Sequence, residues 1–386
     1  MKKYVFILLF FIIIANFNIN RIYVNRAQDV ELQLNSNSVC LMEPISKEII
    51  YKKNEHDKLY PASMTKMMGL LLILEAIDNN QISMNDIVTV SSYASSMGGT
   101  QIFLEENEKM TVESLFKAVA INSANDAIVA HGEHFCLSND AFVSRMNEKA
   151  RELKMFDTHF ENATGFDHDN HYTSSYDMCL LGSHLVGYGE KILKYSSMKE
   201  GYIREESESP FWLVNTNKLL NHYEGMDGLK TGYTSKAGYN LTSTAYRNGV
   251  RLVSTVMNLD TIAHRSQDTI RLLDYGFSKL KAVSLFDRDE IVTTFKIDES
   301  MNQYLHVACK DDVKIIIDKS ESENDIKINA RLIKLSSPYK KGEKVGVLEI
   351  ETKSNKKYTY DLYALNDVQK NNFFHYLFKF LRLMFL

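Results

Sequence analysis

A serine stands at the head of a long apolar segment, and a lysine follows it three residues later. Ser63 and Lys66 belong to residues 60–77, which read YPASMTKMMGLLLILEAI. A serine before an apolar run often caps a helix, because its hydroxyl accepts a hydrogen bond from a free backbone N–H. On a helix, residues i and i+3 also share one face, so that an unprotonated lysine could take the proton of the serine. The spacing therefore fits either a helix cap beside a solvated lysine or an activated serine nucleophile.

Two further motifs favour the nucleophile, because they follow in a fixed order. An SAN triplet at 123–125 comes about 60 residues after Ser63, and a KTG triplet at 230–232 comes roughly a hundred residues later. The SxxK spacing alone is weak, since it recurs elsewhere in the chain. The ordered set SxxK, SxN and KTG is the pattern of penicillin-binding proteins and class A β-lactamases.

The sequence resembles that of a low-molecular-mass penicillin-binding protein, a serine-type D-alanyl-D-alanine carboxypeptidase. The resemblance extends to longer stretches, among them SSMGGTQIFLEENEKMTVESLFKAVAINSANDA, THFENATGFDHDNHYTSSYDM, DGLKTGYTSKAGYNL and SSPYKKGEKVGVLEI. Two positions depart from the family pattern: Ala124 replaces an Asp, and Asn240 stands where a Cys is expected. Neither position is expected to carry the chemistry.

The resemblance and the chemistry of acyl transfer assign a role to each polar residue of the first two motifs. Ser63 is the expected nucleophile, and Lys66 is the general base that takes its proton. Lys66 can do this only when it is neutral, and burial together with a nearby cation such as Lys230 would lower its pKa. Ser123 is expected to relay the proton to the leaving D-alanine. Asn125 is expected to fix Lys66 and to hold the amide of the substrate.

The third motif is expected to bind the substrate. Lys230 and Thr231 would hold the terminal carboxylate. Gly232 would leave room for the substrate to lie against the strand, as an added β-strand would. The backbone N–H groups of Ser63 and Tyr233 would form the oxyanion hole. This chemistry requires no cofactor and no metal ion.

The expected reaction removes the terminal D-alanine from the pentapeptide stems of peptidoglycan through an acyl-enzyme on Ser63, and penicillin is expected to inhibit it. One alternative is a class A β-lactamase, which uses a loop glutamate for deacylation; Glu161 in HFENATGF lies in the corresponding region. A second alternative is a catalytically silent peptidoglycan-binding protein, which the intact motif residues oppose. A third is D,D-endopeptidase activity on cross-links, which the same residues could support.

Two other groups of residues carry weaker signals. The segment FDHDNHY at 166–172 holds two histidines and two aspartates, but their spacing matches no structural zinc pattern. No metal site is therefore expected there. The four cysteines show no metal-like pairing and are expected to be structural thiols: Cys40, Cys136, Cys179 and Cys309.

The pattern of apolar residues predicts an α/β domain followed by a small all-β domain. Two short strands are expected within 30–53, helices after them, and a hairpin around Asn248-Gly249, the strongest short hairpin signal available. A last helix is expected at 269–283. Beyond Phe286, short alternating runs separated by polar turns predict strands. The resemblance implies a serine penicillin-recognising, β-lactamase-like transpeptidase fold with a mainly antiparallel sheet flanked by helices.

Four segments are expected along the chain. Residues 1–27 read as a signal peptide, because two lysines precede an apolar run of about a dozen residues. Cleavage is expected near Ala27, and the alternative is that the segment is retained as an anchor. Residues 28–283 would form the D,D-carboxypeptidase domain and 284–368 the all-β domain. Residues 369–386 would form an amphipathic helix whose few polar side chains make one stripe, as in helices that lie in a membrane interface. The alternative is a helix buried against the β-domain.

These features predict an exported, extracytoplasmic protein that is attached peripherally to the cytoplasmic membrane through its C-terminal helix. The chain has 386 residues and a net charge of −4, so its charge gives no indication of nucleic-acid binding. The expected partners are peptidoglycan pentapeptide stems, β-lactam antibiotics as inhibitors, and the membrane surface. The expected process is cell-wall biogenesis, including the control of cell shape.

Overall fold

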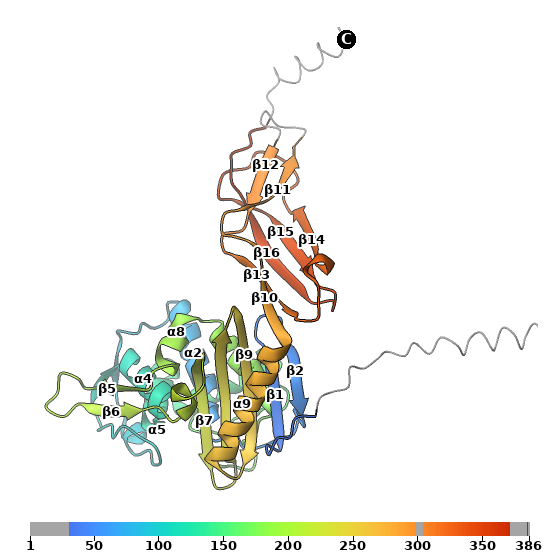
Figure 1. The fold of residues 1–386 in the computed structure, drawn as a ribbon. Helices are drawn as coiled ribbons and strands as arrows, with labels where there is room; N and C mark the ends of the chain where they lie inside the picture. Colours follow the sequence, from blue (N-terminus) through green and yellow to red (C-terminus); the bar gives the residue numbers. More distant parts are fainter. Residues whose placement is uncertain (1–30, 298–303, 371–383, 385–386) are drawn as a thin grey trace, which may run out of the picture. The chain divides into compact units, whose positions relative to one another are not determined.

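A five-stranded antiparallel sheet frames the α/β part of the chain (Figure 1). The computed structural model describes residues 31–297, 304–370 and 384. The strand order is β2-β1-β9-β8-β7, with these bounds: β1 (Ser38–Glu43), β2 (Glu48–Lys53), β7 (Met226–Thr234), β8 (Gly238–Arg247) and β9 (Val250–Leu259). Asn248 and Gly249 connect β8 to β9 with φ angles of 49° and 82°, which are the left-handed values that an Asn-Gly hairpin turn adopts. The predicted hairpin is confirmed.

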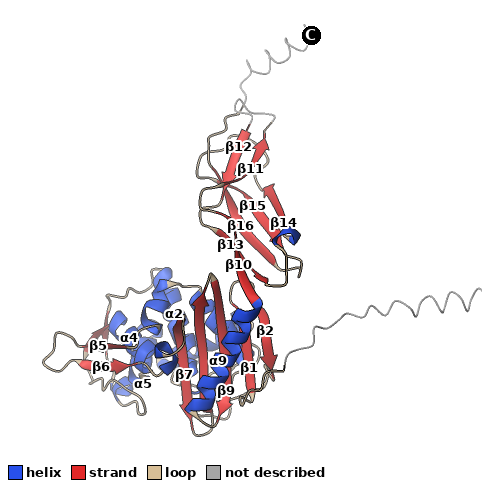
Figure 2. Ribbon diagram, viewed as in Figure 1, coloured by secondary structure: helices blue, strands red, loops and turns tan. Residues whose placement is uncertain are grey.

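Helices cover both faces of this sheet (Figure 2). In α9 (Ile262–Lys279), Gly276 lies against Leu252 of β9. In α7 (Ser175–Val186), Gly182 lies against Val253, the next residue of β9. Successive residues of a strand point to opposite faces, so α7 and α9 pack on opposite sides. The other helices of this part are α2 (Lys66–Asp78), α3 (Ser92–Ser95), α4 (Val112–Asn122), α5 (Asn125–Cys136), α6 (Asn139–Glu152) and α8 (Glu190–Ser196).

The helix that follows the serine is buried on nearly all sides. The apolar residues of α2 from Met67 to Leu74 are each less than 5% exposed, and the helix packs against α4, α5, α6 and α7. A helix that is apolar around its whole circumference belongs in a core. Ser63 lies just ahead of it, in the 3-10 turn η1 (Ala62–Thr65).

Short two-stranded elements and a 3-10 turn complete the α/β part. The strands β3 (Ile87–Thr89) and β4 (Lys109–Thr111) pair with each other, and β5 (Glu200–Ile203) pairs with β6 (Phe211–Val214) as a hairpin. The turn η2 (Lys218–Asn221) precedes β7. All four cysteines are free thiols, as expected.

The C-terminal part is all-β apart from the short turn η3 (Glu323–Asp325). A second antiparallel sheet has the order β11-β12-β16-β15-β14, with these bounds: β11 (Ile291–Lys296), β12 (Tyr304–Ala308), β14 (Lys327–Leu332), β15 (Lys344–Glu351) and β16 (Lys357–Ala364). A separate pair joins β10 (Leu280–Phe286) to β13 (Val313–Asp318). Its own buried cluster includes Leu305, Ile315, Leu348 and Leu362.

The last predicted helix was wrong at both ends. It was expected at 269–283, but α9 begins at Ile262 and ends at Lys279. Residues 280–283 belong to β10, because they pair with Ile315–Asp318 of β13. A strand partner some thirty residues away therefore overrides the helical spacing of this short stretch.

Two predicted segments lie outside the described residues. They are the signal peptide at 1–27 and nearly all of the C-terminal helix at 369–386. Within 31–297, 304–370 and 384, no helix has both the length and the apolar character that a membrane crossing needs.

Candidate active site

The buried amine of Lys66 lies at the centre of the candidate site. Lys66 is the first residue of α2 and is 0% exposed, whereas Ser63 in η1 is half-buried. The Nζ atom of Lys66 lies 2.9 Å from Oγ of Ser63 and donates a hydrogen bond of 2.6 Å to the carbonyl oxygen of Thr164. The Ser63 hydroxyl forms no bond to a backbone N–H in the described part of the chain. The geometry therefore fits the nucleophile and not the helix cap.

The surroundings of Lys66 favour its neutral form. Burial lowers its pKa well below the usual value of 10.5, and the positive charge of Lys230 lowers it further. The carboxylate of Asp126 acts in the opposite direction. A neutral amine that donates to Thr164 keeps its lone pair free to accept the proton of Ser63.

A tight turn after Glu161 supplies the acceptor for Lys66. The side-chain oxygen Oδ1 of Asn162 accepts hydrogen bonds from the backbone N–H groups of Thr164, Gly165 and Phe166 at 2.7–3.2 Å. It also accepts one from the hydroxyl of Thr164 at 2.9 Å. These bonds fix the turn that presents the Thr164 carbonyl to Lys66. The sequence marked this ENATGF stretch as typical of the family but assigned it no role.

Two glycines allow backbone segments to lie close to the turn that carries Ser63. Gly165 has a φ of +90°, and a Cβ there would lie 1.9 Å from the carbonyl oxygen of Ala62. A Cβ on Gly232 would lie 2.5 Å from the carbonyl oxygen of Pro61. Gly232 was expected to make room for the substrate, and the structure gives it this second function. Ala62 itself has a φ of +48°, an uncommon value for a residue with a side chain.

The SAN triplet lies where α4 ends and α5 begins. Ser123 has a left-handed backbone (φ 67°), and its buried Oγ has no hydrogen-bond partner among the described residues. Asn125 donates from Nδ2 to the carbonyl oxygen of Gly98 at 2.7 Å, and its backbone N–H donates to Thr100. Asn125 was expected to fix Lys66, but its side chain holds the loop that contains Gly98 instead.

Asp126, the next residue, was missed by the sequence analysis. Its carboxylate is fully buried and accepts backbone N–H groups from Ile102 and Leu104 at 3.0–3.2 Å. Burial raises the pKa of Asp126, and these hydrogen bonds oppose that rise. Asp126 thus anchors the same loop that Asn125 holds at its other end.

The KTG triplet lies on the edge strand β7. Lys230 is 2% exposed, and its Nζ donates to the carbonyl oxygen of Thr231 at 3.2 Å. Burial, assisted by the positive charge of Arg265, lowers the pKa of Lys230 to about 7. The positive charge of Lys230 in turn lowers the pKa of Lys66.

Neighbouring side chains orient two of the β7 residues that line the cleft described below, Thr231 and Tyr233. The hydroxyl oxygens of Thr231 and Thr216 lie 2.6 Å apart. The ring of Tyr233 is 56% exposed and stacks on Tyr239, with centroids 4.3 Å apart. Only the backbone N–H of Tyr233 was assigned a role, and its ring now defines one edge of the site.

A cleft of about 490 Å³ joins these residues. Ser63, Ser123 and the segment 231–233 line it, while Lys66, Asn125 and Lys230 lie behind its surface. Other lining residues had no sequence signal: Thr100, Val214, Asn215, Thr216, Lys218, Tyr239, Ile262 and Arg265. Among them, Arg265 is 5% exposed and its Nε has no partner in the described structure. A buried cation with a spare donor suits an anionic ligand.

The residues that would support a β-lactamase or a metal site lie outside this cleft. Glu161 does not line the cleft, and its carboxylate is 3.5 Å from Nδ1 of His159. His171 is buried and accepts the Glu161 backbone N–H, while its Nε2 bonds the hydroxyl of Thr65. Burial lowers the pKa of His171 to about 3. Within the described residues, no group of three or more His, Cys, Asp or Glu side chains could hold a metal ion.

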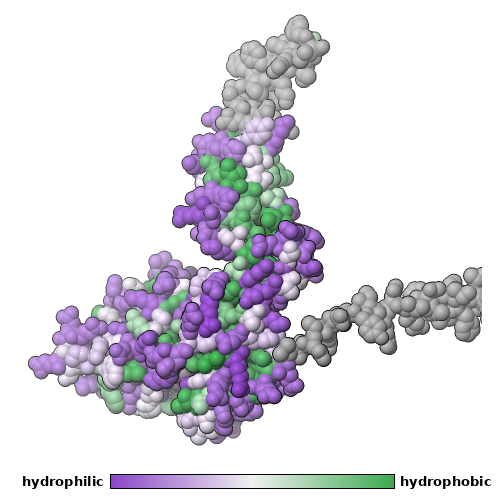
Figure 3. Space-filling view, viewed as in Figure 1, coloured by the Kyte–Doolittle hydropathy of each residue, from purple (hydrophilic) through white to green (hydrophobic). Residues whose placement is uncertain are grey.

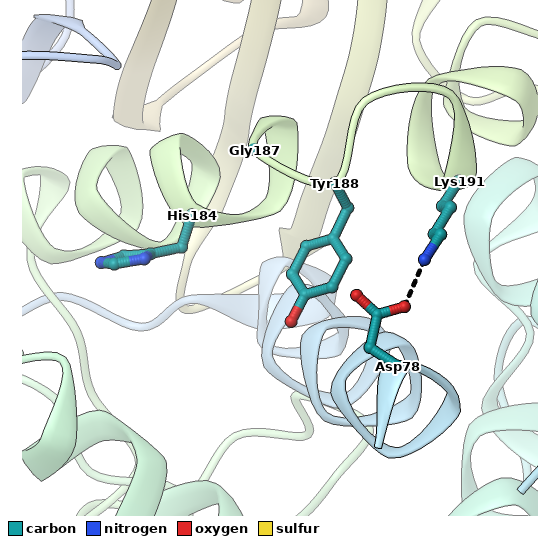
Figure 4. Close-up of a pocket in the computed structure, with 5 residues that line it drawn as sticks. All are labelled: Asp78, His184, Gly187, Tyr188 and Lys191. Atoms are coloured by element: carbon teal, nitrogen blue, oxygen red, sulfur yellow. Dashed lines mark hydrogen bonds and ion pairs between the residues drawn. The ribbon is translucent and has the colours of Figure 1, made fainter. Parts of the chain in front are cut away.

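A second hollow, of about 440 Å³, lies between α2, α7 and α8 (Figure 4). Its lining includes Asp78, His184, Tyr188 and Lys191. Figure 4 shows Lys191 reaching across to Asp78, with which it forms an ion pair. Because this pair neutralises both charges and no motif residue lines the hollow, the chemistry predicted from the motifs lies in the first cleft.

Solved structures with this fold are penicillin-binding proteins. Penicillin-binding protein 5 from Haemophilus influenzae superimposes with a TM-score of 0.69 at 28% identity, over 88% of this chain and 99% of that one. Penicillin-binding protein D2 from Listeria monocytogenes, in its ampicillin-bound form, gives a TM-score of 0.57 at 31% identity, over 64% of this chain and 99% of that one. The chain therefore has the penicillin-recognising fold that its sequence predicted.

Sequence comparisons define the family more closely. Residues 24–261 match the D-alanyl-D-alanine carboxypeptidase family, and residues 281–370 match the C-terminal domain of penicillin-binding protein 5. The D-alanyl-D-alanine carboxypeptidase DacF of Bacillus subtilis is 38% identical, over 90% of this chain and 89% of that protein. DacA of Escherichia coli is 28% identical, over 92% and 88%. The chain belongs to the D-alanyl-D-alanine carboxypeptidase family, which confirms the predicted resemblance.

The close approach of Gly165 to Ala62 generates a prediction. Gly165→Ala should reduce the second-order rate of acylation by a fluorescent penicillin about 100-fold or more, because a shift of the nucleophile by roughly 1 Å has that effect. Gly189→Ala is the matched control, since Gly189 also has a positive φ (+54°) but no atom within 4 Å of a Cβ. Equal rates for the two variants, both folded by circular dichroism, would contradict this role of Gly165.

Proposed function

We propose that this chain is a serine-type D-alanyl-D-alanine carboxypeptidase that removes the terminal D-alanine from pentapeptide stems of peptidoglycan. One observation carries the proposal: a buried amine with a lowered pKa, that of Lys66, lies 2.9 Å from the hydroxyl of Ser63. This is the arrangement that turns a weak serine hydroxyl into a nucleophile. Membership in the family supports the choice of substrate.

The reaction proceeds in two acyl-transfer steps. Ser63 Oγ attacks the carbonyl carbon between the two D-alanines while Lys66 takes its proton. The proton passes through Ser123 to the nitrogen of the leaving D-alanine, and the C–N bond breaks to leave an ester on Ser63. Water then attacks the carbonyl carbon of this ester while Lys66 accepts its proton. The C–O bond to Ser63 breaks, Lys66 returns the proton to Ser63 Oγ, and the shortened stem is released. The N–H groups of Ser63 and Tyr233 hold the oxyanion, with typical contributions of about 3–4 kcal/mol each.

The unpartnered hydroxyl of Ser123 supports its role as the proton relay. Its Oγ is buried, lines the cleft and forms no hydrogen bond in the described structure. A buried hydroxyl without a hydrogen-bond partner destabilises the fold unless a ligand supplies that partner. The nitrogen of the leaving residue would supply that partner. Asn125, fixed on Gly98, would then present its remaining amide groups to the substrate.

Three groups of the cleft suit the terminal carboxylate. Lys230 and Thr231 were expected in this role, and Arg265 adds a buried guanidinium at the same cleft. In the free enzyme burial lowers the pKa of Lys230 to about 7, so its charged form is less favoured than that of an exposed lysine. A bound carboxylate favours the charged form, so that substrate binding and protonation of Lys230 reinforce each other.

Penicillin is proposed to acylate the same serine and to remain attached for longer than a peptide. Fast release in class A β-lactamases depends on a loop glutamate. Here the loop places a backbone carbonyl, that of Thr164, next to Lys66, and Glu161 is directed toward His159. The β-lactamase alternative is therefore not favoured. The intact site likewise disfavours a silent peptidoglycan-binding protein.

Labelling of Ser63 tests this function. The purified protein should release D-alanine from a pentapeptide, and peptide mapping after fluorescent penicillin should find the label on Ser63 alone. Ser63→Ala should lose both activities, whereas Ser114→Ala, a control at another SxxK serine, should keep them. The proposal fails if the label lies on another serine. Rapid turnover of benzylpenicillin that Glu161→Ala abolishes would establish a β-lactamase instead.

The lowered pKa of Lys230 predicts a pH dependence. As the pH rises through about 7, free Lys230 loses its proton. The kcat/KM for a peptide with a free C-terminal carboxylate should then fall relative to that for its C-terminal amide. Lys230→Arg stays protonated and should flatten this decline. Parallel profiles for the acid and the amide would refute the assignment of Lys230.

Attachment to the outer face of the cytoplasmic membrane is also proposed, from the sequence of residues 369–386. Lys379 and Arg382 would each cost roughly 2.5–3.5 kcal/mol at a bilayer centre, so a helix in the interface is favoured over a spanning one. A chain that lacks its signal and ends at Asp367 should leave the membrane fraction and keep acylation of Ser63. Retention of this truncated chain on membranes would contradict the attachment through residues 369–386, and loss of acylation would show that the segment is part of the folded structure.

A further inference from the structure

The β5–β6 hairpin has one buried and one exposed face. Its register pairs Gly201 with Leu213 and Tyr202 with Trp212. Leu213 is fully buried in the hydrophobic core. The alternate residues Tyr202 and Trp212 point outward and are 48% and 54% exposed. Polar residues are the usual occupants of the solvated face of an antiparallel pair, so two large aromatic side chains opposite each other mark a contact surface.

This aromatic face is continuous with the candidate active site. Val214 follows Trp212 by two residues, shares its face of the strand and lines the cleft. Two residues of a strand span about 7 Å, so Trp212 lies one such step outside the cleft. The next residues along the chain, Asn215 and Thr216, also line the cleft.

The two aromatic residues are held in place without a ligand. The indole N–H of Trp212 donates to Oε2 of Glu200 at 3.1 Å, which restricts the orientation of its ring. Lys117 of α4 donates to the carbonyl oxygen of Tyr202 at 2.6 Å and to Glu205 at 3.2 Å. These bonds secure both strands of the hairpin, so the aromatic face is preorganised.

The charge of the hairpin excludes an anionic lipid surface as the occupant. Tyr and Trp side chains are common at membrane interfaces. However, the tip at 204–210 carries Glu205, Glu206 and Glu208, and this end of the molecule, at the left of Figure 3, is coloured as hydrophilic. Anionic headgroups would repel these carboxylates. An uncharged ligand with apolar faces fits better.

We propose that Tyr202 and Trp212 form a docking face for N-acetylhexosamine units in the glycan strands of polymeric peptidoglycan. Pyranose rings present C–H faces that pack on aromatic rings, and their hydroxyl and acetamido groups can bond the Tyr202 hydroxyl and the Glu200 carboxylate. The identity of the polymer rests on the proposed function, whereas the sugar-binding face rests on the hairpin itself.

The position of the face determines which sugars it contacts. Thr216, next to this face along the chain, bonds Thr231, the residue assigned to the terminal carboxylate. The hairpin therefore adjoins the carboxylate end of the cleft, and the stem that is being trimmed leads away from it along β7. The sugars on Tyr202 and Trp212 belong to a neighbouring glycan strand. The face thus raises affinity for the polymer and leaves the reaction with soluble stems unchanged.

The chain offers a direct probe of this face, because Trp212 is its only tryptophan. Titration with the β-1,4-linked tetramer of N-acetylglucosamine should give a saturable change in tryptophan fluorescence. Tyr202→Ala should weaken that binding about tenfold or more. The matched control is Tyr246→Ala, which removes a tyrosine that is 50% exposed on another strand, β8. No saturable change in the wild-type protein, or equal weakening by both variants, would overturn the proposal.

Activity on two substrates gives an independent test. Trp212→Ala should release D-alanine from a soluble pentapeptide at the wild-type rate, but about tenfold more slowly from purified peptidoglycan sacculi. Equal rates on sacculi, or binding of the wild-type protein to anionic phospholipid vesicles that Trp212→Ala abolishes, would overturn the docking face. Failure of the wild-type protein to act on either substrate would refute the proposed function, and the fluorescence titration would still decide the sugar-binding face.

Discussion

The structure of the site depends on burying the amine of Lys66 without leaving it charged and unpaired. An isolated ammonium group in an apolar interior is strongly destabilising, so the buried lysine loses its proton more readily. The apolar helix α2 buries the amine, Lys230 repels its proton, and the Thr164 carbonyl accepts one N–H. The lone pair that remains can accept the proton of the Ser63 hydroxyl, whose oxygen lies 2.9 Å from the amine. Burial and activation of the serine are thus the same physical effect.

This arrangement requires two backbone segments to converge on the short turn η1 and the residue before it. Asn162 fixes the turn that carries Thr164, Gly165 lets this turn contact Ala62, and Gly232 lets β7 contact Pro61 from the other side. At either glycine an added Cβ would lie 2.5 Å or less from a backbone carbonyl oxygen, so neither position has room for a methyl group. The sheet and helices therefore serve mainly to hold these backbone segments in place. The cleft lies along the edge strand β7.

The parts of the site that could be predicted are side chains in ordered motifs. Ser63, Lys66, Ser123 and Lys230 could be found because they stand in the ordered motifs of a known family. In the structure Ser63 and Ser123 line one cleft, and the two lysines are buried. The Thr164 carbonyl could not be found, since every residue has a carbonyl. Arg265 lies on α9 outside any motif. The fold was predictable where local signals decide, as at Asn248-Gly249, and not at 280–283, where pairing with β13 decides.

The protonation state of Lys66 is the most direct test of this account. In protein labelled with ¹³C at lysine Cε, the resonance that disappears in Lys66→Arg reports the titration of this amine alone. Its midpoint should lie well below the usual 10.5, and Lys230→Ala should raise it, because a neighbouring positive charge is removed. A midpoint near 10.5, with no response to Lys230→Ala, would show that Lys66 is an ordinary ammonium group and would contradict its role as the base.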